Sequence, residues 1–292
     1  MDKHHLKITL VVDNEAEGDL LCEHGFAAWI ELDDRKILFD TGQGAALIPN
    51  CERLGIDPGH ADALVLSHGH YDHSGNIPEF LNRNPDARLY FGSGFRQTRF
   101  SCHPDKAPRD ISVGDGVRQA FNALPEERRI EVTAHRYLFP GVGISGPIPR
   151  LAPFEDSGGP FFFDAEKQQA DLIDDELSLW FETRDGLLVL TGCCHAGLLN
   201  TLDHIRQVSG IRRIHGIIGG LHLLNASAER LDQTCRFLAD CAPDFIAPCH
   251  CTGAQAVQRL LQEFGTKMVR PGRAGQVFSA EMAGVSRCKT GS

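Results

Sequence analysis

The chain has 292 residues, which is long enough for one large domain with a substantial buried core. It carries 29 Lys and Arg against 39 Asp and Glu, so its formal net charge of −10 argues against nucleic acid or an anionic membrane as a partner. Hydrophobic residues at 42% and charged residues at 23% exclude a disordered or fibrous chain. The unusual counts are 14 His and 10 Cys, and these residue types point to metal chemistry.

The N-terminus shows no targeting segment. Residues 1–5 are polar and lead directly into a strand-like run at 6–12, and the longest apolar runs elsewhere have only strand length. We therefore expect a cytoplasmic location and no membrane span. The chain contains no CxxC pair, which argues against a closed structural zinc site, and the cysteines are expected to be reduced.

Apolar runs bounded by turn residues alternate along most of the chain. They predict strands at 6–12, 26–32, 36–39, 63–66, 177–182, 187–190, 214–218 and 245–247. Helical spacing predicts helices at 45–54, 78–83, 197–208, 226–241 and 253–264. Strands first and strand-helix units later favour an α/β fold of two sheets with helices outside.

The domain organisation follows from the same patterns. Residues 1–280 are expected to form a single domain, with a tail at 281–292. A middle segment at about 92–160 is rich in Gly, Pro and Arg, and we interpret it as strands and long loops that cover a site.

The strongest chemical signal is the segment SHGHYDH at residues 67–73, directly after a strand that looks buried. Imidazole and carboxylate are the usual ligands of zinc, iron and manganese, and four of them within six residues cannot all face a hydrophobic core. His68 and His70 can lie on the same side of an extended segment, while Asp72 and His73 can reach a second point nearby. The segment therefore predicts a metal site with room for two neighbouring ions.

Other ligands must come from elsewhere, because one loop cannot complete the coordination of two ions. His195, His222 and His250 each follow a later strand-like run, where convergence on one sheet edge would bring them together. His195 and His250 are expected to bind metal, and His222 is left open between a ligand and a catalytic group. The remaining histidines lack this context, and most are expected at the surface: His4, His5, His24, His60, His103, His135, His204 and His215.

These features together resemble the metallo-β-lactamase fold superfamily, in which an HxHxDH motif follows a strand and histidines follow later strands. The chain is similar over essentially its whole length to a branch that includes the methanopterin-pathway dihydropterin synthases. The similarity lies in residues 12–14, 23–25, 38–43, 66–73, 148–150, 174–176, 191–197, 219–222 and 250–253. The HxHxDH motif is specific for the superfamily, and TGCCHAG with HCTG is specific for the branch.

The resemblance implies a four-layer αββα sandwich with one or two transition-metal ions at one edge of the sheets. The implied ligands are His68, His70, Asp72, His73, Cys193, His195 and His250. Cys193 stands where most relatives have a bridging aspartate, which leaves the metal count open, and His195 takes the role of a middle histidine that has no clear counterpart at 134–190. Zinc is expected first, with iron or manganese as alternatives.

The implied function is that of a metal-dependent enzyme acting on a phosphorylated or pyrophosphorylated small molecule. One hypothesis is a transfer reaction that joins a pterin methyl pyrophosphate to a phosphoribosylated aromatic amine and releases pyrophosphate. The alternative is hydrolysis of a phosphodiester, lactone or related bond. Asp72 and His222 are the expected catalytic residues. Arg150 and Arg96 are candidate phosphate contacts, with a surface ion pair as the alternative for each. A third hypothesis is a metal or redox sensor without turnover.

Overall fold

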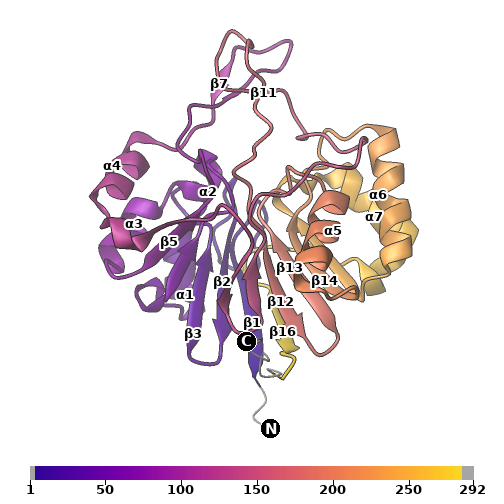
Figure 1. Ribbon diagram of the computed structural model, residues 1–292, viewed down its shortest axis with the longest axis horizontal. Helices are drawn as coiled ribbons and strands as arrows, with labels where there is room; N and C mark the ends of the chain where they lie inside the picture. Colours follow the sequence, from indigo (N-terminus) through magenta and orange to yellow (C-terminus); the bar gives the residue numbers. More distant parts are fainter. Residues whose placement is uncertain (1–3, 285–292) are drawn as a thin grey trace, which may run out of the picture.

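Two large β-sheets lie face to face in the computed structural model, which describes residues 4–284 (Figure 1). The first sheet runs in the order β16 (Val277–Glu281), β1 (His5–Val12), β2 (Ala27–Leu32), β3 (Arg35–Phe39), β4 (Ala63–Val65), β5 (Arg88–Phe91) and β8 (Arg129–Glu131). The second runs in the order β15 (Phe245–Cys249), β14 (Ile214–Gly220), β13 (Gly186–Thr191), β12 (Leu179–Thr183), β10 (Val142–Ile144) and β9 (Arg136–Phe139).

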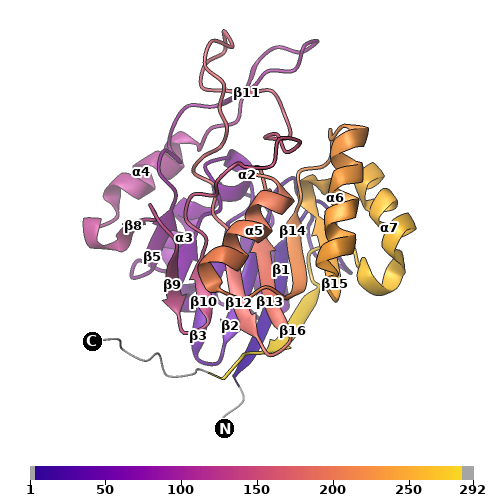
Figure 2. The same ribbon diagram turned by 45° about the vertical axis from the view of Figure 1, so that its right-hand side comes forward.

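Helices cover the outer face of each sheet (Figures 1 and 2). The first sheet carries α1 (Leu47–Leu54), α3 (Ile77–Arg83) and α4 (Asp115–Ala123), and the second carries α5 (Leu198–Ser209), α6 (Ala228–Cys241) and α7 (Ala254–Met268). This layering confirms the expected αββα sandwich. Within residues 4–284 no helix combines the length and the apolar character that a membrane crossing requires.

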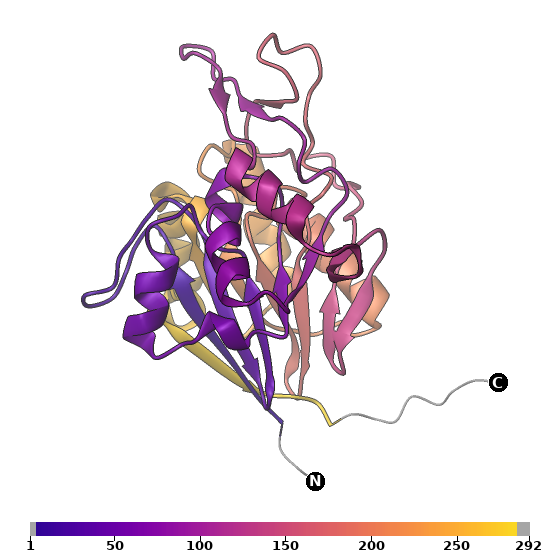
Figure 3. The ribbon, with the colours of Figure 1, turned by 90° about the vertical axis from the view of Figure 1, so that its left-hand side faces the viewer.

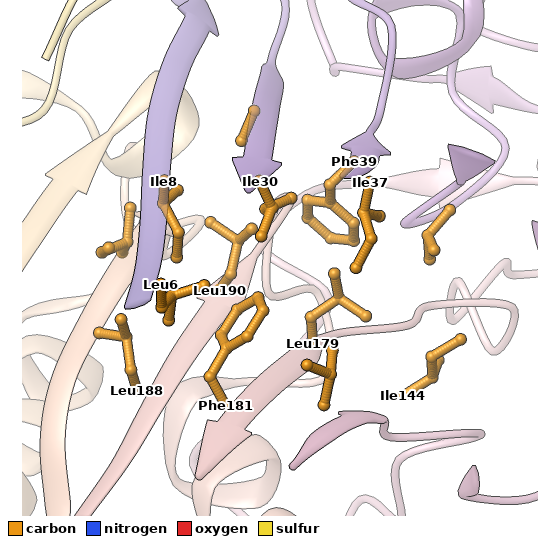
Figure 4. Close-up of a cluster of buried hydrophobic side chains, with 14 of the residues drawn as sticks. Leu6, Ile8, Ile30, Ile37, Phe39, Ile144, Leu179, Phe181, Leu188 and Leu190 are labelled. Atoms are coloured by element: carbon orange, nitrogen blue, oxygen red, sulfur yellow. The ribbon is translucent and has the colours of Figure 1, made fainter. Parts of the chain in front are cut away.

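The alternation of side chains along the strands explains the layers. In β2, Ile30 points into the space between the sheets while its neighbour Trp29 packs under the helices of the first sheet. In β12, Phe181 points inward and Trp180 packs under the helices of the second sheet. Figure 4 shows the inner cluster, where side chains of both sheets interdigitate. Because both faces of each sheet are covered, the central strands are almost continuously apolar, as the sequence pattern indicated.

The middle segment differs from the sequence prediction. It contains α4, which buries Val117 and Phe121 against the first sheet, in place of strands and loops alone. The segment also contributes to a small sheet of β11 (Phe161–Phe162), β6 (Phe100–Ser101) and β7 (Arg109–Asp110). We call residues 99–111 and 157–171 the arm, because in Figures 1 and 3 they project from the end of the sandwich where β4 and β13 end.

The C-terminal boundary also differs from the prediction. The expected tail at 281–292 begins too early, because Glu281 ends β16 and Met282 is buried. The backbone N–H of Ala283 donates to the Glu182 carbonyl oxygen at 2.8 Å, so the chain is still paired there. The rest of the expected tail, at 285–292, lies outside the described residues.

Candidate metal centre

The expected donors lie at one edge of the two sheets, where several strands end. The segment 67–73 follows β4, and Cys193 and His195 follow β13. His222 follows β14 and His250 follows β15. Since β13, β14 and β15 pair in parallel, their carboxyl ends meet at the same edge, as the sequence argument required. The structure thus brings together donors that lie almost two hundred residues apart.

Local backbone geometry fixes the loop that carries the histidine motif. The N–H of Ser67 donates to Asp40 Oδ1 at 2.6 Å, and the N–H of Gly69 donates to Asp175 Oδ2 at 2.8 Å. A Cβ at Gly69 would lie 1.8 Å from the Phe95 carbonyl oxygen, so only glycine fits there. The glycine between the two histidines is therefore a packing requirement of the motif.

His68, His70 and His195 form the first group of donors. One ligand atom from each lies within 4.8 Å of the others, and His68 Nε2 is 2.9 Å from His70 Nδ1. His195 Nδ1 lies 2.8 Å from the Ser157 carbonyl oxygen, which accepts its proton and leaves the lone pair on Nε2. That Nε2 atom is buried and has no hydrogen-bond partner. His195 is thus held in the tautomer that a metal ligand requires.

His73, Cys193 and His250 form a second group. His73 Nδ1 donates to Asp40 Oδ2 at 2.8 Å, so its Nε2 carries the lone pair and lies 3.1 Å from Cys193 Sγ. The same Nε2 is 3.2 Å from His250 Nε2, whose ring is oriented by Asn14 Oδ1 at 3.0 Å from Nδ1. A carboxylate outside one imidazole and an amide oxygen outside the other direct the inner nitrogens toward each other.

Asp72 lies beside this second group. Its Oδ2 atom is 3.5 Å from His250 Nε2, 3.8 Å from His73 Nε2 and 3.1 Å from His24 Nε2. His24 is exposed, as expected, and its ring also reaches Asp72 at the centre. Cys251 also joins, since one group of possible donors consists of Cys193, His250 and Cys251.

The donor set fits a transition metal. Buried imidazole nitrogens, a carboxylate and thiols are the ligands that zinc and iron accept, and they are a poor match for magnesium or calcium. Nε2 of His195 is buried without a partner, and His68 Nε2 and His70 Nδ1, which are 2.9 Å apart, would both gain from a cation between them. Each of the expected ligands belongs to at least one group of possible donors at this sheet edge. The number of ions stays a prediction, because Cys193 stands where the resemblance implies a bridging aspartate.

The electrostatics of the centre favour a bound cation. Burial lowers the pKa of His68, His70 and His195 well below the usual value, so these rings are neutral. Burial alone would raise the pKa of Asp72, but His73 and hydrogen bonds from His24 and His250 bring it well below its usual value. The resulting carboxylate accepts hydrogen bonds from His24 and His250 beside the second group of donors.

His250 behaves differently from the other rings. Burial opposes its protonation, but the hydrogen bond to Asp72 and the nearby Cys251 raise the pKa of His250 to about 9. A proton on this ring would balance the charge of Asp72, and a bound metal would compete with that proton.

Buried carboxylates also hold the backbone next to His195 and His250. Glu176 accepts hydrogen bonds from the N–H groups of His195 and Ala196, both at 2.6 Å, and burial raises the pKa of Glu176 to about 7. Asp13 accepts a hydrogen bond from the N–H of His250 at 2.9 Å. The left-handed backbone of His250, at φ 49°, is kept by these contacts.

The two arginines predicted to contact substrate lie elsewhere. Arg150 Nη1 donates to the His195 carbonyl oxygen at 2.8 Å, so it supports the backbone of a donor instead of facing the cavity. Arg96 lies over the Phe121 ring, 4.5 Å from its centroid, and bonds Asn122 at 2.9 Å on the outer side of the first sheet. The charge of these two arginines was clear from the sequence, but the direction in which their side chains point could not be predicted from it.

The catalytic candidates do face a cavity. It has a volume of about 850 Å³ and is lined at its floor by Asp72, His222, His24 and His250. The ring of His222 lies 4.1 Å from that of His195, and its Nδ1 atom is buried without a hydrogen bond. The arm forms one wall and α7 forms another. Small molecules can therefore reach the donors from solvent.

Comparison with known proteins agrees with this geometry. Residues 21–96 match the model of the metallo-beta-lactamase superfamily, and this segment contains the histidine motif. With the αββα sandwich, the match shows that the chain carries a metallo-beta-lactamase superfamily domain.

Individual relatives extend the similarity over most of the chain. The chain is 27% identical to the 7,8-dihydropterin-6-methyl-4-(beta-D-ribofuranosyl)-aminobenzene-5'-phosphate synthase of Methanocaldococcus jannaschii, over 83% of this chain and 85% of the relative. It is 28% identical to the uncharacterized protein MJ0448 of the same organism, over 87% and 94%. The crystal structure of Tm1679, a metal-dependent hydrolase of the beta-lactamase superfamily, superposes with a TM-score of 0.77 at 26% identity, covering 94% of this chain and 98% of that one. These matches confirm the expected resemblance.

Proposed function

We propose that the protein is a metal-dependent enzyme acting on a phosphorylated or pyrophosphorylated small molecule, with zinc as the first expected metal and iron or manganese as alternatives. The observation that carries the proposal is the convergence of buried imidazole nitrogens, those of His195 and His73 in tautomers suited to metal binding, beside Asp72 at the floor of a cavity open to solvent. A structural metal site is closed by its protein ligands, whereas a catalytic one remains accessible. Access to the donors favours turnover over a purely sensory role.

The chain's own residues suggest how the work is divided. When bound, the metal would polarise a substrate oxygen or lower the pKa of a water molecule. Asp72 is kept ionised next to the cavity, so it can accept a proton as well as bind the cation. His222 lines the cavity, which suits its ring to contact substrate or to move a proton, while its unpartnered Nδ1 atom is buried. His24 holds Asp72 from the opening of the site.

Transfer to an aromatic amine with loss of pyrophosphate is the first form of the proposal. It is supported by the similarity to the dihydropterin synthase over most of both chains. Hydrolysis of a phosphodiester, lactone or related bond is the second candidate, and the likeness to the hydrolase Tm1679 favours it. The two forms share the metal centre and differ in whether an amine or water attacks.

One assay separates these forms. Protein loaded with zinc, manganese or iron(II) is given a pterin methyl pyrophosphate with and without a phosphoribosylated aromatic amine, and separately a bis(aryl) phosphodiester or a lactone. A transferase releases pyrophosphate only when the amine is present, whereas a hydrolase cleaves without it. The His60→Ala variant is a matched control, because His60 is an exposed histidine remote from the centre. Full metal loading without turnover of any of these substrates would contradict the proposal.

A further inference from the structure

The arm brings positive charge over the metal centre. We infer that Lys106 and Arg109 form an anion subsite that binds a phosphate or pyrophosphate group of the substrate while its reacting part lies at the metal donors. The inference deepens the proposed function and rests on it. Lys106 comes from the loop between β6 and β7, and Arg109 comes from β7. Both side chains line the same cavity as Asp72 and His250.

The arm presents its charges selectively. Four charged residues lie between His103 and Ile111, and of these Lys106 and Arg109 line the cavity while Asp105 and Asp110 do not. The Asp110 carboxylate instead accepts hydrogen bonds from the N–H and hydroxyl of Ser112, at 2.8 and 2.5 Å. The cavity wall therefore receives the cations of this segment, and His103 beside them adds a further nitrogen donor.

These cations also lack the acidic partners that other arginines have. Arg213 bonds Asp244 at 2.7 Å and Arg128 bonds Asp86 at 2.8 Å, but within residues 4–284 neither Lys106 nor Arg109 has a carboxylate within ion-pair distance. Arg109 uses one N–H to donate to the Tyr71 hydroxyl at 2.7 Å and leaves its other donors for a ligand. An anion in the cavity would supply the missing negative charge.

Tyr71 fixes Arg109 relative to the centre. The guanidinium lies 5.0 Å from the centroid of the Tyr71 ring, a cation–π distance, and Tyr71 directly precedes Asp72. The base of the arm is anchored by buried Arg99, which bonds Asp175 at 2.6 Å, and the same carboxylate accepts the N–H of Gly69 in the histidine motif. The subsite and the metal loop are thus held by one set of contacts.

The net charge of the chain favours a local source of positive charge at the cavity. At −10 the overall field repels an anionic substrate, so attraction must come from a bound metal or from nearby cations. A phosphate group is matched by one planar guanidinium with several N–H donors and one ammonium. Lys106 and Arg109 supply this pair at the wall of the cavity.

The test is pyrophosphate binding by the full-length, metal-loaded protein, measured by titration calorimetry. We compare the unchanged chain, the Lys106→Gln/Arg109→Gln variant and the control Lys267→Gln, which removes an exposed charge on α7 outside the cavity lining. The double variant should bind about tenfold more weakly or worse, since charge-assisted contacts are lost. The control should bind as the unchanged chain does, and metal content and thermal unfolding should be the same in all three.

Each outcome separates the subsite from the proposed function. Equal pyrophosphate affinity in the double variant and the control would overturn the subsite, as would the absence of pyrophosphate binding by the unchanged protein. If affinity falls in the double variant while the protein takes up no metal, the subsite stands and the proposed metal-dependent function fails. If affinity falls only when the metal donor His68 is replaced by Ala, pyrophosphate binds the metal alone and the subsite is again overturned.

Discussion

The two halves of the sandwich contribute to the centre in different ways. The first half supplies four donors from one short segment after β4, with His68 and His70 in a loop and Asp72 and His73 in the short helix α2 (Tyr71–Ser74). The second half supplies its donors singly or in pairs at the ends of three parallel strands, from Cys193 to His250. The spacing of a contiguous motif is enough to predict a metal site, whereas separate donors can be predicted to meet only once the sheet that brings their strand ends together is known.

Both halves nevertheless use the same device to hold their donors. Buried carboxylates accept backbone N–H groups next to the expected ligands. Asp40, after β3, and Asp175, before β12, hold the loop of the first half, whereas Glu176 and Asp13, which follows β1, hold the segments of the second half. Each carboxylate costs desolvation and is stabilised by these bonds. The halves therefore differ in how their donors are distributed along the sequence. The following experiments test whether the two halves contribute equally to metal affinity.

The largest effect is expected from Arg99→Met, which removes the cation between two buried carboxylates. Arg99 is 1% exposed and lies 2.6 Å from Asp175 Oδ1 and 3.2 Å from Asp171 Oδ2. Loss of one member of a buried ion pair lowers the free energy of unfolding by about 3–5 kcal/mol, and urea unfolding would measure this change. Arg88→Met, at an exposed residue of β5, is the control. A change below about 1 kcal/mol would show that the motif loop does not depend on the arm.

Replacement of one donor in each half comes next. His68→Ala and His195→Ala should each weaken metal binding by more than about 100-fold, because residues that only support a ligand already contribute about 10–100-fold. Competition with a chromogenic chelator measures both affinities, with His60→Ala as the control. Unchanged affinity in either variant removes that histidine from the ligands and makes the two halves unequal.

The supporting carboxylates should give a smaller effect. Asp40→Asn leaves His73 Nδ1 without its charged acceptor, and Glu176→Gln weakens the bonds to the backbone of His195. We expect a loss of metal affinity of about 10–100-fold in each case. If only Asp40→Asn has this effect, the first half alone determines the metal affinity, and the equivalence of the halves is wrong.

The smallest effect is expected at the residue that departs from the usual family pattern. Cys193→Asp introduces the carboxylate that the family resemblance implies at this position, and it should raise the number of ions bound per chain or tighten the second ion several-fold, by less than about 1.4 kcal/mol. Equilibrium dialysis followed by elemental analysis measures the stoichiometry. No gain over the parent would count against a missing bridge and leave the thiol as a ligand in its own right.

The sequence was sufficient for the layered fold, and it predicted the side chains that the first half brings together. Apolar strands such as 187–190, and the spacing of His68, His70 and Asp72, can be interpreted from neighbouring residues alone. His195 and His250 required the further step that parallel strand ends converge. The match of residues 21–96 to the superfamily model agrees with the local part of this argument.

What the sequence did not predict depends on contacts between distant segments. His24 reaches Asp72 across 48 positions of the chain, and nothing in its immediate neighbours shows this. Arg150 and Arg96 have the right charge but point to a carbonyl and to a phenyl ring. Helix α4 was missed because two buried side chains, Val117 and Phe121, give too short an apolar stripe. Tertiary contacts decide each of these cases.

The central claim is that both halves bind the same transition-metal centre. X-ray absorption at the metal edge of the purified, full-length protein tests it most directly. We expect at least one zinc, iron or manganese ion per chain, with nitrogen or oxygen neighbours at about 2.0–2.2 Å and sulfur at about 2.3 Å for zinc. The sulfur signal should fall in Cys193→Ala and disappear in the Cys193→Ala/Cys251→Ala variant. A protein that holds no transition metal after purification and takes up none on reconstitution would contradict the account.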